Sequence, residues 1–407
     1  MTDRSVEVLY NAATIGVLHV RGSLTTFQFN DDYHECSPRP IVGQQFEESP
    51  RRVWRQSARV PAWFANVLPE RGPLLDYLAQ QLEFNPRNEG DVLLAVGSDL
   101  PGAVALGREV DSQGHHHDPV DALGPATINP TDSAASSVRF SVAGVQLKLS
   151  MMDTAGGFRL PGAGRLGDFL VKFPGTYPGM VRNEYAVMRW AALCGLDVPE
   201  IRLAQPSQVT LPEGLGRFDQ SELYVVRRFD RALNSKVHIE DFNQVIGQWP
   251  EEKYRGCSSE SLGRLIHSIC GESDFWEYLR RLLFIVLIGN EDAHLKNWSL
   301  RYSDVRHARL APAYDLVSTV VYDGLDRGLA LKLGGSVEFG RIGLPQFERV
   351  AAKSGADETL VRGVLGDFVK VFEASGLQIR EEQLLTDDFW RRLENHHASL
   401  RVLRTGG

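Results

Sequence analysis

Cysteine is scarce in this chain, and it is not spaced to crosslink the fold. Only four cysteines occur, none in a Cys-x-x-Cys pair: Cys36, Cys194, Cys257 and Cys270. This excludes a dense disulfide framework and predicts free thiols in a reducing compartment. No apolar run approaches the ~20 residues that span a bilayer, and the first residues lack the apolar core of a signal peptide. We therefore expect a cytoplasmic protein with no membrane partner.

The chain also lacks an excess of positive charge and any internal repeat. Its net charge of −8 argues against a whole-chain attraction to nucleic acid. Arginines do cluster at Arg51, Arg52 and Arg55, but solvated helix faces are the favoured interpretation. The 407 residues, 43% hydrophobic and 24% charged, indicate a globular protein of two or three domains.

Hydrophobic spacing divides the chain into four parts. Alternating residues over 5–29 predict three strands, and leucines at helical spacing follow from Leu74 to Leu82, so 1–107 is expected to be a small α+β module. Residues 108–137 are polar and turn-rich, which predicts a linker or exposed connection. Its three histidines, His115 to His117, are expected to be loop residues, because consecutive side chains cannot all face one ion.

The remaining chain changes from strand patterns to helical ones. Residues 138–235 predict a β-rich nucleotide-binding part with strands at 138–142, 147–151, 169–173 and 223–229, and a helix at 183–194. Residues 236–407 predict an all-helical C-terminal lobe with helices at 259–271, 273–289, 345–354, 357–375 and 381–404. A β-rich lobe followed by a helical lobe is the layout of a two-lobed nucleotide-binding enzyme, and the fold class is α+β.

The most informative polar residues follow the apolar run 282–288. Asp292 and Lys296 precede Asn297, and a second acid, Asp315, comes 18 residues later. An Asp, an Asn five positions on and a further Asp is the order used by phosphotransferases. In this interpretation Asp292 orients or deprotonates a hydroxyl, Lys296 neutralises the transferred phosphoryl group, and Asn297 and Asp315 bind Mg²⁺. The alternative is a polar turn after a helix C-terminus.

Three other segments can supply the nucleotide-binding parts. The segment from Ser141 to Lys148 lies between two predicted strands and can cradle phosphates, although an ordinary hairpin turn is an alternative. Lys172 lies inside an apolar strand, where it can reach the α- and β-phosphates or be a solvent-facing edge lysine. Arg228-Phe229-Asp230-Arg231 ends a strand and can present its backbone to an adenine edge, while Asp230 and Arg231 have the alternative of a turn with a surface ion pair.

In this order the segments resemble the HipA family, the serine/threonine-kinase toxins of bacterial type II toxin–antitoxin modules. The resemblance covers nearly the whole chain, including Gly22-Ser23-Leu24 with Phe27 and Phe29. The other matching segments are 141–148, 169–174, 183–185, 228–231, 288–289, 292–297 and 314–316.

The resemblance implies a kinase-like fold that uses ATP and Mg²⁺. The catalytic residues would be Asp292 and Lys296, and the metal ligands Asn297 and Asp315. Ser141 matches the position of autophosphorylation, where a phosphate would repel ATP and inactivate the enzyme. The nucleotide-binding residues would be Val142, Ala143, Gly144, Val145, Gln146, Lys148, Lys172, Arg228, Phe229, Asp230 and His294.

The resemblance also implies partners. Family targets are aminoacyl-tRNA synthetases, chiefly glutamyl-tRNA synthetase, whose phosphorylation halts translation and promotes growth arrest and persistence. The usual partner is a helix-turn-helix antitoxin of the HipB type that binds operator DNA. Leu147 and Arg227 depart from the family pattern, each standing where glutamate is common. A small-molecule kinase and a catalytically idle corepressor are the alternatives.

Overall fold

The computed structural model describes residues 3–110, 147–161, 165–175, 177–211, 222–232, 235–325 and 328–403. The chain forms two compact units, each assembled from three stretches. The first unit comprises residues 1–173, 204–250 and 302–306, and the second comprises 174–203, 251–301 and 307–407. The predicted strand at 138–142, the segment 141–146 and His115 to His117 lie outside the described residues.

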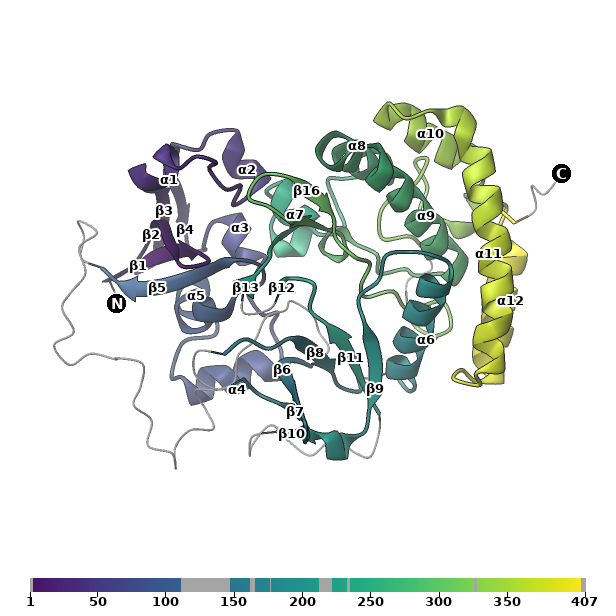
Figure 1. The fold of residues 1–407 in the computed structure, drawn as a ribbon, viewed down its shortest axis with the longest axis horizontal. Helices are drawn as coiled ribbons and strands as arrows, with labels where there is room; N and C mark the ends of the chain where they lie inside the picture. Colours follow the sequence, from purple (N-terminus) through teal and green to yellow (C-terminus); the bar gives the residue numbers. More distant parts are fainter. Residues whose placement is uncertain are drawn as a thin grey trace. The chain divides into compact units, whose positions relative to one another are not determined.

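The first unit begins with an antiparallel sheet (Figure 1) whose strand order is β4-β3-β2-β1-β5. The alternation predicted from the sequence appears in burial, since Phe27 and Phe29 are buried while Gln28 between them is exposed. One face of the sheet therefore meets the core. The strands are β1 (Asp3–Tyr10), β2 (Ala13–Arg21), β3 (Leu24–Phe29), β4 (Trp54–Ser57) and β5 (Val104–Glu109).

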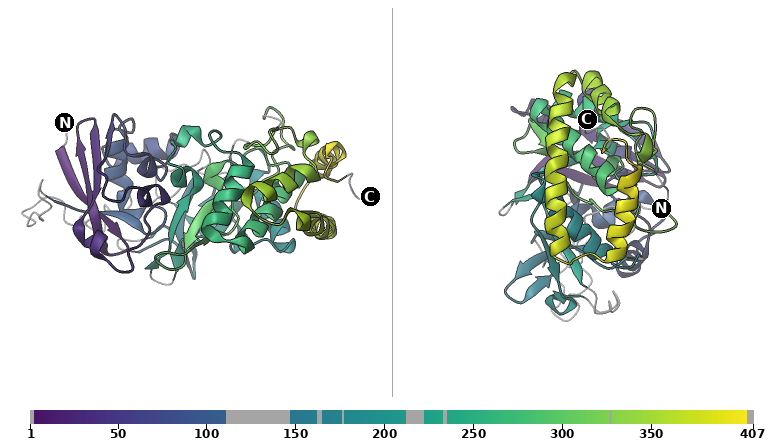
Figure 2. Two further views of the ribbon diagram at one scale, coloured as in Figure 1. Left: turned by 90° about the horizontal axis from the view of Figure 1, so that it is seen from above. Right: turned by 90° about the vertical axis from the view of Figure 1, so that its right-hand side faces the viewer.

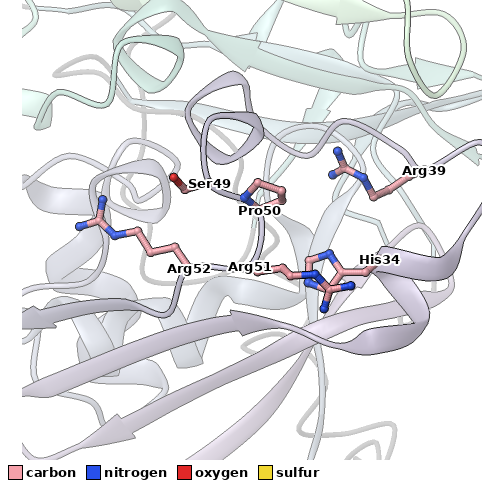
Figure 3. Close-up of a pocket in the computed structure, with 6 residues that line it drawn as sticks. All are labelled: His34, Arg39, Ser49, Pro50, Arg51 and Arg52. Atoms are coloured by element: carbon pink, nitrogen blue, oxygen red, sulfur yellow. The ribbon is translucent and has the colours of Figure 1, made fainter.

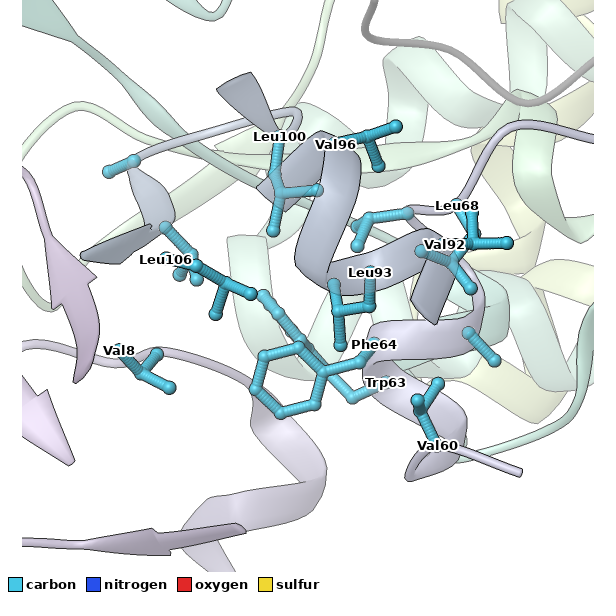
Figure 4. Packing of buried hydrophobic residues seen from close by; sticks show 14 of the residues in the cluster. Val8, Val60, Trp63, Phe64, Leu68, Val92, Leu93, Val96, Leu100 and Leu106 are labelled. Atoms are coloured by element: carbon cyan, nitrogen blue, oxygen red, sulfur yellow. The ribbon is translucent and has the colours of Figure 1, made fainter. Parts of the chain in front are cut away.

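Five helices of the first unit contribute to the same core. Trp63 and Phe64 of α3 and Leu93 of α5 are almost fully buried in the cluster drawn in Figure 4. The Asn88 side chain caps α5 by accepting from the backbone N–H groups of Gly90 and Asp91. The helices are α1 (Asp31–Glu35), α2 (Gln44–Glu47), α3 (Ala62–Ala65), α4 (Pro73–Gln81) and α5 (Glu89–Val96).

A second sheet of the first unit has the order β10-β7-β6-β8-β11. Its apolar side chains, among them Leu149, Val171 and Val225, join the same hydrophobic cluster. Its strands are β6 (Lys148–Thr154), β7 (Gly157–Arg159), β8 (Phe169–Lys172), β10 (Val209–Thr210) and β11 (Leu223–Arg227). The other elements between residues 201 and 245 are β9 (Ile201–Ala204), β12 (Arg231–Ala232), β13 (Ser235–Lys236), β14 (His238–Asp241) and α7 (Phe242–Val245).

The second unit is mainly helical. Trp190 of α6 stacks on Phe372 of α11 with ring centroids 4.2 Å apart, and it also contacts Trp390 of α12. Helices α11 and α12 are joined by a short turn and form a hairpin (Figure 2). The long helices are α6 (Met180–Leu193), α8 (Ser259–Cys270), α9 (Glu272–Ile288), α10 (Leu344–Ser354), α11 (Val361–Glu381) and α12 (Asp387–Ser399).

The helices predicted after residue 236 are present, but the C-terminal part of the chain is not all-helical. Two short strands, β15 (Ser299–Tyr302) and β16 (Ala308–Leu310), lie side by side after the predicted catalytic loop. Their hydrogen bonds fix the chain between the predicted ligands Asn297 and Asp315. In the described part of the chain, no helix is both long enough and apolar enough to cross a bilayer.

Candidate active site

The loop that carries Asp292 begins where the buried helix α9 ends. Gly289 closes the helix with φ 62° and ψ 51°, a left-handed conformation that favours glycine. A Cβ there would also lie 2.4 Å from a methyl group of Val320. The Thr319 hydroxyl donates to the Gly289 carbonyl oxygen (3.1 Å) and accepts from the Glu291 N–H (2.7 Å). These contacts turn the chain sharply out of the helix.

Asp292 is held by its backbone and reached by solvent through its side chain. Its N–H donates to Asn290 Oδ1 (2.9 Å), and its carbonyl oxygen accepts from Asn297 Nδ2 (2.8 Å). The side chain is 56% exposed, and Oδ1 of its carboxylate accepts a 2.5 Å hydrogen bond from the Tyr254 hydroxyl. A fixed, accessible carboxylate is the geometry that a general base requires.

Asn297 and Asp315 line one pocket of the second unit, together with Asn290 and Tyr314. Because Asn297 donates through Nδ2, its Oδ1 lies on the opposite branch of the amide. Asp315 has φ 55°, a left-handed backbone conformation that is uncommon for non-glycine residues and frequent at functional sites.

The donor set fits Mg²⁺. This ion takes oxygen ligands, and it is usually held by one or two protein groups while water and phosphate oxygens complete its shell. A carboxylate and an amide on one pocket meet that need. Within the described residues, no cluster of three or more His, Cys, Asp or Glu side chains suited to a metal occurs.

His294 and Lys296 occupy different surroundings in the same loop. His294 is buried, and its ring lies edge-on to Tyr254 with centroids 5.0 Å apart. Burial, with the charge of Lys253 next, lowers the pKa of His294 to about 3, so the imidazole is neutral at pH 7. Lys296 belongs to the short 3₁₀ turn Leu295–Asn297, and its carbonyl oxygen accepts from the Tyr314 hydroxyl (2.8 Å).

The lysines predicted to bind nucleotide lie together in the first unit. Lys148 of β6 and Lys172 of β8 are directly opposite in the antiparallel register, and both are buried. The edge-strand alternative for Lys172 is wrong, because β8 lies between β6 and β11. Directly opposite residues share one face of a sheet, so the two lysines bring two positive charges to the same face. Their binding of nucleotide phosphates stays a prediction.

Asp230 and Arg231 do form an ion pair, but the pair is buried together with Arg228 and does not lie at the surface. Arg228 donates to both oxygens of the Asp230 carboxylate and to Ser150 Oγ. Arg231 donates to Asp230 and, across 3.0 Å, to Asp99. Burial alone would raise the pKa of Asp230, but Arg228 and Arg231 hold that pKa well below its usual range. These side chains tie the end of β11 to β6 and to the N-terminal module.

Two parts of the predicted nucleotide site, the strand end at Phe229 and the phosphate loop, stay predictions. Phe229 is half-buried, and the use of its backbone by an adenine edge stays a prediction. The predicted phosphate loop lies outside the described residues: Ser141, Val142, Ala143, Gly144, Val145 and Gln146.

The sequence did not identify Tyr254, Asn290 and Thr319 as contributors to the loop. Asn290 adjoins the motif, and an Asn side chain often accepts from the backbone N–H two residues later in a turn. This pattern could have predicted its contact with Asp292. Tyr254 is 38 residues from Asp292 and Thr319 is 28 residues from Glu291, so only the fold brings them together.

A separate basic pocket of about 540 Å³ lies in the first unit (Figure 3). Arg51 and Arg52, predicted to lie on a solvated helix face, belong instead to the non-helical segment between α2 and β4. The guanidinium of Arg39, which also lines the pocket, is held by a two-point contact with Glu47. The pocket is lined by His34, Arg39, Ser49, Pro50, Arg51 and Arg52.

A solved structure with a similar fold identifies the structural class of this protein. A solved structure described as "Shewanella oneidensis MR-1 Toxin Antitoxin System HipA, HipB and its operator DNA complex" matches with a TM-score of 0.72 and 21% identity. The match covers 98% of this chain and 97% of that one. This likeness concerns the fold, and it confirms the predicted two-lobed, kinase-like α+β class.

Sequence comparison then gives the family. Residues 6–107 match the HipA N-terminal domain and residues 140–375 the HipA-like C-terminal domain. The Sinorhizobium fredii protein named "Putative kinase Y4dM" is 36% identical over 90% of this chain and 89% of its own length. The "Serine/threonine-protein kinase toxin HipA" of Shewanella oneidensis is 26% identical over 68% of this chain and 67% of its own. The chain belongs to the HipA family, as its motifs indicated.

Proposed function

We propose that this protein is a serine/threonine protein kinase toxin that transfers the ATP γ-phosphate to a protein hydroxyl. One observation carries the proposal: Asp292 projects from a loop that Asn297 also holds, and Asn297 shares a pocket with Asp315. A base beside a pair of magnesium ligands is the arrangement that phosphoryl transfer needs.

Each residue of the loop has a distinct task. Asp292 accepts the proton of the acceptor hydroxyl, and its exposed side chain allows a protein substrate to reach it. Asn297 and Asp315 would hold Mg²⁺, which neutralises charge on the β- and γ-phosphates when it is bound. Lys296 adds positive charge for the transferred group. His294, neutral and buried, packs against the Tyr254 ring and remains a proposed nucleotide-binding residue.

Lys148 and Lys172 would bind the nucleotide phosphates from the first unit. Their paired positions on β6 and β8 present two charges on one face of the sheet. Self-inactivation by phosphorylation of Ser141 belongs to the same proposal, because a phosphate beside the nucleotide repels it. The proposal also includes a target among the aminoacyl-tRNA synthetases, of which glutamyl-tRNA synthetase is the first to test. Phosphorylation of that target would arrest translation and growth.

The proposed partner is a helix-turn-helix antitoxin that carries operator DNA. The structurally similar HipA was solved together with HipB and its operator DNA, which supports the same kind of assembly here. The net charge of −8 favours contact with DNA mainly through the antitoxin.

Phosphate incorporation tests the proposal directly. Purified protein with Mg²⁺ and γ-labelled ATP should label itself and a glutamyl-tRNA synthetase added as acceptor. Asp292→Asn and Asp315→Asn should each lower the labelling rate by at least ~10³-fold, because one loses the base and the other a metal ligand. Asp367→Asn, which changes an exposed aspartate of α11, is the matched control.

Two results would count against the proposal. Unchanged labelling in either site variant would refute the assignment of that residue. No incorporation by the wild-type protein, with antitoxin and operator binding intact, would favour the catalytically idle corepressor instead.

A further inference from the structure

Residues Lys253 and Tyr254 contact the catalytic loop of the second unit at three points. The Lys253 carbonyl oxygen accepts from the Leu295 N–H (3.1 Å). The Tyr254 ring lies edge-on to the His294 ring at 81°. The Tyr254 hydroxyl donates to Oδ1 of Asp292 at 2.5 Å. The segment before helix α8 is thus docked on the loop through its backbone, a ring and a hydroxyl.

One of these contacts reaches the Asp292 carboxylate, whose Oδ1 also lies 4.0 Å from Nε2 of the His294 ring. Asn290 and Asn297 hold the Asp292 backbone, and neither of these bonds reaches the carboxylate. The side chain is 56% exposed, so packing constrains its torsions only weakly. A hydrogen bond from a hydroxyl to a carboxylate is charge-assisted and short, and it selects one side-chain rotamer. Tyr254 supplies that bond.

We propose that Tyr254 is a positioning residue for Asp292, which deepens the function proposed above and rests on it. The phenol holds Oδ1 so that the carboxylate faces the acceptor hydroxyl. During transfer the acceptor O–H gives its proton to the carboxylate and its oxygen bonds to the γ-phosphorus, while ADP leaves. Tyr254 keeps its own proton throughout.

A positioning role predicts which kinetic constant changes when the Tyr254 hydroxyl is removed. The bond orients the base, so its loss slows the step at saturating ATP. It leaves the ATP concentration that gives half the maximal rate unchanged, because the bond is made to the base and not to the nucleotide ligands. Misorientation of a catalytic group commonly costs one to two orders of magnitude in rate.

The test compares Tyr254→Phe with the wild-type full chain. Tyr254→Phe keeps the ring on His294 and removes only the hydroxyl. We expect the limiting rate of self-labelling with γ-labelled Mg-ATP to fall about tenfold, with an unchanged half-saturating ATP concentration and an unchanged melting temperature. Tyr77→Phe, which removes a phenol hydroxyl from α4 of the first unit, should behave as wild type.

The outcomes separate this inference from the function on which it rests. If wild type labels itself, Asp292→Asn does not, and Tyr254→Phe equals wild type, the inference is wrong and the kinase assignment stands. A faster Tyr254→Phe would also overturn it, since the hydroxyl would then obstruct the acceptor. If Asp292→Asn labels as fast as wild type, the proposed function itself fails. A lower melting temperature in Tyr254→Phe with a parallel rise in half-saturating ATP would indicate a structural role and refute positioning.

Discussion

Glu240 of β14 shows how strongly burial changes a single carboxyl group in the first unit. Its oxygens accept from the Gln44 N–H, from Trp63 Nε1 (3.2 Å) and from the Tyr302 hydroxyl (3.2 Å). Burial nevertheless outweighs these donors and raises the pKa of Glu240 to about 8. The carboxyl is therefore mostly protonated at neutral pH, and its contacts with α2 and α3 are those of a neutral acid.

The raised pKa of Glu240 predicts a pH dependence of stability. A carboxyl whose pKa is higher in the folded state stabilises the fold below its ordinary value of 4.5 and loses that contribution as pH rises through about 8. Glu240→Gln cannot ionise, so it should melt at a higher temperature than wild type at pH 9 and at a similar temperature near pH 5. The difference should grow by at most ~1.4 kcal/mol per pH unit. Melting curves from pH 5 to 9 provide the measurement.

The matched control for Glu240 is Glu358→Gln, which changes an exposed glutamate and should leave the pH profile as it is. Parallel profiles for wild type and Glu240→Gln would contradict a raised pKa at this position.

At the residue scale, the sequence predicted groups whose chemistry is local in the chain. Asp292 and Asn297 lie five positions apart, and their order alone indicates phosphoryl transfer. The partners that orient or neutralise such groups were not predictable. Tyr254 reaches Asp292 across 38 residues, and Asp99 pairs with Arg231 across 132. Neither pair shares a helix turn or a hairpin, so no spacing rule connects them.

At the scale of elements, helix α12 contacts the end of helix α9, which leads into the loop that carries Asp292. His396 Nε2 donates to the carbonyl oxygen of Val286, and His397 Nε2 to that of Leu287, each at 2.8 Å. These carbonyls belong to the last turn of α9, where backbone N–H donors become scarce, although Val286 also accepts from the Gly289 N–H (3.3 Å). The two histidines therefore fasten the start of the Asp292 loop, although α12 follows the 140–375 stretch matched by the C-terminal family domain.

Removing the two histidine donors should loosen the end of α9. His397→Ala removes the histidine donor of the Leu287 carbonyl and should cost about 1–3 kcal/mol of stability, and His396→Ala should cost less because Val286 keeps the Gly289 N–H. Thermal melting measures the loss, and self-labelling at 37 °C should fall with it because the loop loses its anchor. His396→Gln and His397→Gln retain an N–H donor and should recover part of both. Equal melting temperatures for the Ala variants and wild type would show that the histidines do not act as caps.

Elements with strong periodicity were predicted well, and short ones were not. The alternation over residues 5–29 predicted β1, β2 and β3, and the apolar runs predicted α8 and α9 within about two residues. Strands β15 and β16 were missed because segments of four and three residues are too short to show an alternating pattern. Their pairing arises from the chain returning after the catalytic loop, which is a tertiary effect.

At the scale of the molecule, the first unit is completed by residues far along the chain. The sheet β4-β3-β2-β1-β5 lies wholly within residues 3–110. Buried polar groups of the helices and turns packed on this sheet find partners outside residues 3–110. Asp99 pairs with Arg231, the Asn66 side chain donates to the Gln248 carbonyl oxygen (2.8 Å), and Glu240 accepts from Trp63. The N-terminal module predicted for residues 1–107 thus contains a complete sheet, but some of its buried polar side chains are paired with residues from later in the chain.

This incompleteness predicts that a fragment of residues 1–110 is much less stable than the same residues in the full chain. Removing Arg231 alone leaves Asp99 as a buried charge without its main counter-ion, which costs about 3–5 kcal/mol. The loss is comparable to the total stability of a small domain. We expect the fragment to melt broadly and at a lower temperature. Joining residues 222–250 to it through a flexible linker should restore a cooperative transition. Circular dichroism during heating measures both. Adding the same segment with Arg231→Met, which keeps the length of the side chain without its charge, should restore less. A fragment that melts as sharply as the full chain without residues 222–250 would show that the polar partners contribute little, and that the sheet and its apolar core suffice.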